Sequence, residues 1–211
     1  MVGLAILVAL LPGIHPQPDP AEAVLKLLVF GCHAAEVSPL AERDPDVSAR
    51  LRSVENRCAA FAQREPKPRA DSLDGMVATA RWGYEQHLFA IAAGDAEAEA
   101  ARYVAVLRPC YEWEGFHDCP EREAVFADRY LSEHPSSAFA AFLPLLAAHR
   151  WLCAAEGYEY EMTSGVPASK PGAGPTRARL SYVQRLETAS RSRDPLVRAA
   201  AGILEGRGAC F

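Results

Sequence analysis

The sequence predicts an all-α fold, a compact array of antiparallel helical hairpins with about seven or eight helices that disulfide bonds stabilise. Apolar residues recur at helical spacing along most of the 211 residues. Alternating apolar and polar runs typical of strands are missing, and the six cysteines form an even set. Because 50% of the residues are hydrophobic, we expect one sizeable core, and the length suits a single domain.

The N-terminal residues favour export of the chain. An apolar run from Met1 to Leu11 ends at a Pro-Gly pair, as in the hydrophobic region of a signal peptide. It is too short to span a bilayer, which takes about 20 residues. No Lys or Arg precedes the run and no small-x-small cleavage site follows it, so a helix packed on the domain is the alternative. We interpret 1–20 as a candidate signal peptide with a Pro-rich linker, 21–211 as one helical domain, and the location as secreted or periplasmic.

Helix signals divide the first half of the chain into four predicted helices. The clearest follows the cap signal at Asp44, where apolar residues at i, i+4, i+7, i+11 and i+14 form one helical stripe. Pro20 suits the first position of the helix before it. Gly94 and the aspartate after it end the third helix and cap the fourth. The four cover 21–32, the stripe 47–61, 72–93 and 96–108.

Similar signals predict four helices in the second half of the chain. Asp118 and Glu121 resemble a capping box at the start of the first of them. The most hydrophobic one is expected to end before Gly157, and Asp194 with the proline after it begins the last. Residues 163–176 are rich in Gly, Pro, Ser and Thr, which predicts a flexible exposed loop. The predicted helices cover 120–133, 138–157, 177–190 and 195–205.

The six cysteines predict three disulfide bonds formed in an oxidising compartment. Their number alone leaves the pairing open, but their placement favours one pattern. Two of them face inward on neighbouring predicted helices, and two others bracket a short loop. No CxxC motif is present, so we expect neither a zinc knuckle nor a thioredoxin-type redox pair. The favoured pairs are Cys32–Cys58, Cys110–Cys119 and, by elimination, Cys153–Cys210.

Two segments resemble tetratricopeptide-type helical hairpins. The first joins the Trp-Gly-Tyr run at 82–84 to the helix that carries Tyr103. The second joins Phe126 and the Tyr-Leu pair at 130–131 to the His-Pro-Ser-Ser turn at 134–137. Together they cover about a third of the chain, without a fixed repeat period. The resemblance implies binding of a protein or peptide on a concave helical face, without catalysis.

The short ring expected between positions 110 and 119 is the most unusual segment. It holds three aromatic residues, three acids and a histidine, which favours a rigid recognition loop. A cation site built from its acids and histidine is a second interpretation. The alternative to both is that the tryptophan and phenylalanine only fill the core. The predicted binding residues are Trp113, Glu114 and Phe116.

A different class of function depends on whether four side chains converge. His149 is expected on a buried helix face, as a neutral core histidine, a tuned base or a metal ligand. If it lay near His117, Asp118 and Glu156, the four would form the site of a small metal-dependent or acid/base hydrolase. The acidic and aromatic residues at 156–161 otherwise indicate a solvated helix end.

No motif supports a cofactor or a nucleic-acid partner. The chain lacks GxSxG, GxxxxGK[ST], GxGxxG and HExxH, so we expect no cofactor and no bound metal. A net charge of −5 without clustered Lys and Arg argues against nucleic acid, and no stable membrane span is expected. The sequence therefore favours a non-catalytic interaction or scaffold module, with another protein or peptide as its partner, over the hydrolase.

Overall fold

The computed structural model describes residues 32, 35–92, 94, 96–110, 113–165 and 172–210. Within these ranges the chain forms eight α-helices and no strand, which confirms the predicted all-α class. The segment 1–31, with the candidate signal peptide and most of the predicted helix 21–32, lies outside the described residues. None of the described helices is long and apolar enough to cross a membrane. The helices are α2 (Ser38–Ala41), α3 (Pro45–Arg64), α4 (Leu73–Ile91), α5 (Glu97–Val106), α6 (Asp118–Glu133), α7 (Leu143–Ser164), α8 (Pro175–Ser190) and α9 (Pro195–Arg207).

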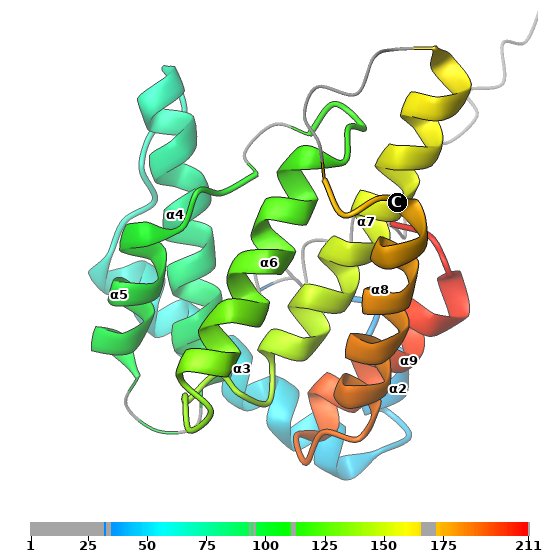
Figure 1. Ribbon diagram of the computed structural model, residues 1–211. Helices are drawn as coiled ribbons and strands as arrows, with labels where there is room; N and C mark the ends of the chain where they lie inside the picture. Colours follow the sequence, from blue (N-terminus) through cyan, green and yellow to red (C-terminus); the bar gives the residue numbers. More distant parts are fainter. Residues whose placement is uncertain are drawn as a thin grey trace, which may run out of the picture.

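Helix α7 is the central helix of the fold. It packs against α6 on one side and α8 on the other (Figure 1). Helix α4 packs between α3 and α5, and α9 contacts α3, α7 and α8. Every residue of α7 from Leu143 to Ala155 is buried, including His149 and Arg150, as expected for a helix that other helices surround.

Two helices begin where the cap signals predict them. The Asp44 carboxylate accepts hydrogen bonds from the backbone N–H groups of Asp46 and Val47 at the start of α3. The Asp194 carboxylate caps α9 in the same way, and in both helices a proline follows the cap. The capping box predicted at Asp118 is wrong, because α6 begins there without a side-chain cap.

Helix α7 differs from the predicted helix 138–157 at both ends. Residues 138–142 form turns, and the helix begins at Leu143 with a proline in its first turn. It continues to Ser164, where Gly165 follows with a φ of 69°, a conformation that glycine adopts without strain. The predicted loop is therefore shorter than expected, and its residues 166–171 lie outside the described residues.

Gly157 does not end α7, contrary to the prediction. It is buried within the helix, where the N-terminus of α6 packs against it. A Cβ at this position would lie 2.5 Å from the backbone nitrogen of His117 and 2.7 Å from its Cα. The glycine is thus explained by a close approach of backbone to backbone, a second reason for glycine besides helix termination.

A buried ion pair joins helices α4, α6 and α7. Arg150 on α7 donates from Nε to the carboxylate of Glu123 on α6, and both side chains are buried. Tyr84 on α4 donates its hydroxyl to Glu123 and accepts from Arg150 Nη2 at 2.9 Å. The second oxygen of Glu123 accepts from the backbone N–H of Cys110. The two charges are thus paired and hydrogen-bonded, as buried charges must be.

All three predicted disulfide bonds are present. Each connects a different part of the fold: the start of the described chain to α3, the two ends of the loop before α6, and the C-terminal segment to α7. The last joins residues 57 positions apart. On a chain-entropy model, such a bridge stabilises the fold by about 4 kcal/mol. The bonded pairs are Cys32–Cys58, Cys110–Cys119 and Cys153–Cys210, with Cα–Cα distances of 5.7, 5.6 and 4.9 Å.

Peptide mapping of the protein produced in an oxidising compartment tests this pattern. We expect no reaction with a thiol reagent after unfolding without reductant, and three cross-linked peptides after proteolysis. Mass spectrometry of the digest with and without reductant identifies them. Free thiols at all six positions, or a cross-link between any other pair of cysteines, would contradict the fold described above.

Candidate functional site

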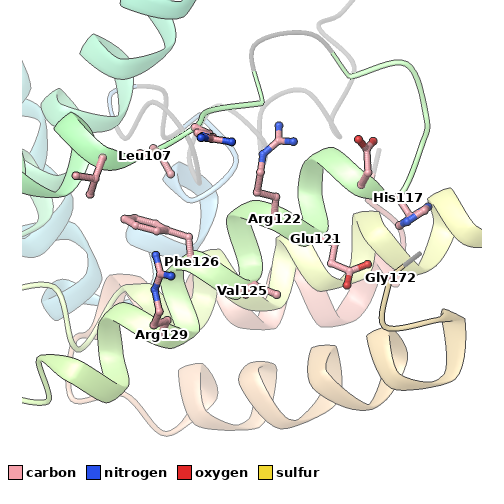
Figure 2. Close-up of a pocket in the computed structure, with 11 residues that line it drawn as sticks. Leu107, His117, Glu121, Arg122, Val125, Phe126, Arg129 and Gly172 are labelled. Atoms are coloured by element: carbon pink, nitrogen blue, oxygen red, sulfur yellow. The ribbon is translucent and has the colours of Figure 1, made fainter. Parts of the chain in front are cut away.

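Helices α5 and α6 border the main pocket of the described chain, which has a volume of about 590 Å³ (Figure 2). A second hollow of about 540 Å³ adjoins it, since Val106, Phe126 and Arg129 line both. We refer to the two together as the α5–α6 groove. The main pocket is lined by Val106, Leu107, Arg108, His117, Asp118, Glu121, Arg122, Val125, Phe126, Arg129 and Gly172.

Aromatic rings close the base of the groove. The Tyr103 ring on α5 contacts the rings of Phe126 and Tyr130 on α6, each with a centroid distance of 4.8 Å and an edge-to-face geometry. Among the apolar residues that line the main pocket, Val106 is 67% exposed and Val125 is 47% exposed. The groove therefore offers apolar side chains to a ligand on a base that is already packed.

Four exposed arginines line the groove. Within the described part of the chain, none of them forms an ion pair with a carboxylate. One stacks its guanidinium on the ring of Phe126, at 5.6 Å from the centroid. Four acids, Glu99, Asp118, Glu121 and Glu133, line the same groove. The arginines are Arg102, Arg108, Arg122 and Arg129.

Two of the four acids that line the groove, Glu99 and Glu121, have hydrogen-bond partners. Glu99 accepts from the hydroxyls of Tyr130 and Ser137 and from a backbone N–H. Burial raises the pKa of Glu99, but these hydrogen bonds outweigh it and leave the pKa below its usual value. Glu121 accepts from the Tyr158 hydroxyl and from the backbone N–H of Ala173. The charge of Arg102 also lowers the pKa of Glu99, so these two carboxylates are hydrogen-bonded within the groove without forming an ion pair with its arginines among the described residues.

His117 lies at the end of the main pocket, 1% exposed. Its Nδ1 is 2.7 Å from Glu161 Oε1, and the same oxygen accepts from its backbone N–H at 3.0 Å. The imidazole stacks on the Tyr158 ring with centroids 3.9 Å apart and an interplanar angle of 15°. Glu161 is buried in the contact between α6 and α7, so the expectation of a solvated helix end is wrong for this residue.

The proposed hydrolase residues occupy two separate places. His149 accepts at Nδ1 from Arg150 Nη1 at 2.9 Å and donates from Nε2 to the Cys210 carbonyl. Burial, followed by the charge of Arg150, lowers the pKa of His149 well below its usual value. Glu156 accepts from the Cys210 backbone N–H at 2.9 Å, and burial raises its pKa. Both side chains hold the C-terminal segment.

The other two hydrolase residues line the main pocket. His117 is bound to Glu161, which lies 12 positions beyond His149 on α7, or about 18 Å along the helix axis. Asp118 follows His117 at the start of α6. His117 and Asp118 thus line the pocket while His149 and Glu156 bind the Cys210 backbone, and no hydrogen bond links the two pairs within the described part of the chain.

The predicted binding residues border a smaller hollow of about 290 Å³ that shares Asp118 and Arg122 with the main pocket. Trp113 donates from Nε1 to the Phe116 carbonyl at 2.6 Å and packs partly against the core. Glu114 is exposed. The hollow beside this loop is compatible with a recognition role, and the contact of Trp113 with the core is compatible with a packing role.

One group of side chains in the described ranges has the spacing of metal ligands. The ligand atoms of His149, Cys153 and Cys210 lie within 4.8 Å of one another. The two sulfurs are bonded to each other, and Arg150 donates to the imidazole. In this structure the group is a buried cross-link of the C-terminal segment to α7.

Comparison with known proteins adds no assignment, because no family model, curated protein or solved structure matches the chain.

His87 is a buried histidine without a function in the groove. The sequence indicates a surface or packing role, and the structure shows packing: its ring is 1% exposed and 4.3 Å from the Phe142 ring. Neither ring nitrogen has a hydrogen-bond partner among the described residues. Burial, followed by the charge of Arg50, lowers the pKa of His87 to about 3.

The fold should therefore lose stability in acid. The unfolded chain binds a proton at His87 near pH 6.5, whereas the folded chain does so only near pH 3. Stability is full above pH 6.5 and falls by up to about 1.4 kcal/mol per pH unit between these limits. His149 acts in the same direction.

The variant His87→Leu tests this pH dependence. Its free energy of unfolding in urea, measured between pH 4 and 8, should change less with pH than that of the parent protein, and at pH 7 it should be unchanged or higher. An unchanged slope, matching the exposed control His134→Gln, would contradict this.

Proposed function

We propose that the protein is a non-catalytic interaction module that binds an acidic, partly apolar segment of another protein in the α5–α6 groove. The observation that carries this proposal is the set of four arginines that form no ion pair with a carboxylate of the described residues, around the exposed side chains of Val106 and Val125. A guanidinium fork binds a carboxylate through two parallel hydrogen bonds, which makes arginine suited to acidic side chains.

The size and composition of the groove agree with a peptide ligand. Its two hollows, of about 590 and 540 Å³, fall in the range of roughly 300 to 1,000 Å³ that is common for ligand pockets. A segment that alternates acidic and apolar residues can place its acids on the arginines and its apolar side chains on the valines.

The position of the groove supports the same conclusion. It separates a hairpin of α4 and α5 from a hairpin of α6 and α7, the two segments that resemble tetratricopeptide-type hairpins. That family's mode of action is peptide binding on a helical face, without a catalytic group. The three disulfides suit an oxidising compartment, so we propose a secreted or periplasmic location and a partner in the same compartment.

Fluorescence anisotropy with a synthetic peptide tests the proposal. The probe alternates Glu and Leu, carries its dye at the C-terminus and is acetylated at the N-terminus. The double variant Arg122→Glu/Arg129→Glu should weaken binding at least tenfold, or about 1.4 kcal/mol. The control Arg43→Glu/Arg193→Glu changes the net charge equally at exposed arginines outside the groove and should bind like the parent protein.

Two further peptides distinguish this recognition from nonspecific binding. Replacing every Glu by Gln, or by Lys, should abolish binding, and raising the salt concentration should weaken binding of the acidic peptide. Equal affinity for the acidic and the Lys peptides would contradict the proposal. So would equal losses in the groove variant and its control.

A further inference from the structure

Nε2 of the His117 imidazole has no hydrogen-bond partner among the described residues. Glu161 Oε1 faces both the backbone N–H and Nδ1 of His117, and a carboxylate oxygen between two nitrogens acts as the acceptor. An imidazole that carries one proton therefore carries it at Nδ1, and its Nε2 keeps a lone pair. Although the side chain is 1% exposed, no hydrogen bond to Nε2 is present among the described residues.

Gly172 packs closely against the side chains around this nitrogen. A Cβ on Gly172 would lie 3.0 Å from His117 Nε2, 2.5 Å from Glu121 Oε2 and 1.9 Å from the Tyr158 hydroxyl. Both Gly172 and His117 line the main pocket, and Figure 2 shows them at the same end of it, away from Leu107 and Arg129. A side chain at position 172 would clash with these atoms, so only glycine fits at this end of the pocket.

Carboxylates lie near the imidazole of His117. At the His117 end, Asp118 and Glu121 line the pocket. Glu161 lies at the Nδ1 side of the ring, and its buried Oε2 has no hydrogen-bond partner among the described residues. At the other end the lining carries Arg102 and Arg129 together with Glu99 and Glu133. The lone pair on Nε2, with the carboxylates of Asp118 and Glu121 at the same end of the pocket, favours a cation that donates hydrogen bonds.

We propose that the His117 end of the α5–α6 groove is a subsite for a primary ammonium group of the ligand. This inference rests on the proposed function and gives the bound peptide a direction, with its ammonium group on His117 and Asp118 and its acids on the arginines. The N-terminal amine and a lysine side chain offer the same chemistry. Capture of a terminal amine is a known mode of peptide recognition.

Three versions of the probe peptide separate the two sources of the ammonium group. One has a free N-terminus, one is acetylated, and one is acetylated with Lys as its first residue. The free-amine peptide should bind about tenfold more tightly than the acetylated one, as expected for a charged hydrogen bond. Recovery with the Lys peptide would assign the subsite to a lysine side chain, and no recovery would assign it to the N-terminus. Equal binding of all three peptides would overturn the inference and leave the proposed function intact.

Variants at the subsite provide the matched comparison. His117→Asn keeps an N–H group near Glu161 but has no atom in place of Nε2, and Asp118→Asn removes only charge. Each should lower the affinity for the free-amine peptide to the level of the acetylated one, without changing the affinity for the acetylated one. An effect of the same size on both peptides would indicate disturbed packing and contradict a role for Nε2.

A measurement without any peptide keeps the subsite testable even if the acidic probe does not bind. ¹⁵N NMR of the histidine rings, recorded where His117 carries a single proton, should show that proton at Nδ1. Its Nε2 resonance should shift on addition of glycinamide and stay unchanged with acetylglycinamide, the neutral control. A proton on Nε2 in the free protein, or no shift with glycinamide, would overturn the inference.

Discussion

The buried ion pair of Glu123 and Arg150 is the constraint on which the arrangement of the helices depends. Removing either charge from water costs several kcal/mol unless the other compensates it. Glu123 therefore holds α6 against α7, Tyr84 brings α4 to the same point, and Glu123 also binds the backbone N–H of Cys110 at the start of the loop before α6. Burial alone would lower the pKa of Arg150, but Tyr84 and Glu123 raise it, so the guanidinium stays charged.

The ion pair also determines the shape of the groove. Helix α6 forms one wall, and its inner face carries Glu123 while its outer face carries Arg122, Val125 and Arg129. Further along α7, Gly157 admits the backbone of His117 and Glu161 binds it. Since α6 is attached to α7 at both places, the arginines and the imidazole project from a wall with a fixed position. A ligand then meets preorganised charges, which lowers the entropy cost of binding.

The sequence predicts features that are local to one segment. Residue spacing alone predicts the apolar stripe that carries Cys58, the helix cap at Asp44 and the two cysteines that flank the 110–119 loop. The disulfide pattern follows from these features. Gly157 illustrates the limit of such local prediction. A glycine in a helical pattern indicates the end of the helix, and only the structure shows that the backbone of His117 packs against it. The partner of Arg150 comes from another helix, 27 positions away.

The groove is harder to predict than the core. Arg122, Val125 and Arg129 lie on the exposed face of α6, and their spacing is that of an ordinary solvated helix face. Glu161 belongs to an acidic run that indicates solvent exposure, yet it is buried because α6 covers it. Only the packing of separate helices distinguishes these residues, and periodicity within one helix contains no information about it.

A double-mutant cycle on Glu123 and Arg150 tests the dependence of the fold on this ion pair most directly. The free energy of unfolding in urea is measured for Glu123→Leu, Arg150→Met and the double variant. Each single variant should lose about 3–5 kcal/mol, because it leaves the other charge buried without its partner. The double variant should lose about 1–3 kcal/mol less than the sum of the two single losses. Two small losses that simply add would contradict the central role of the pair.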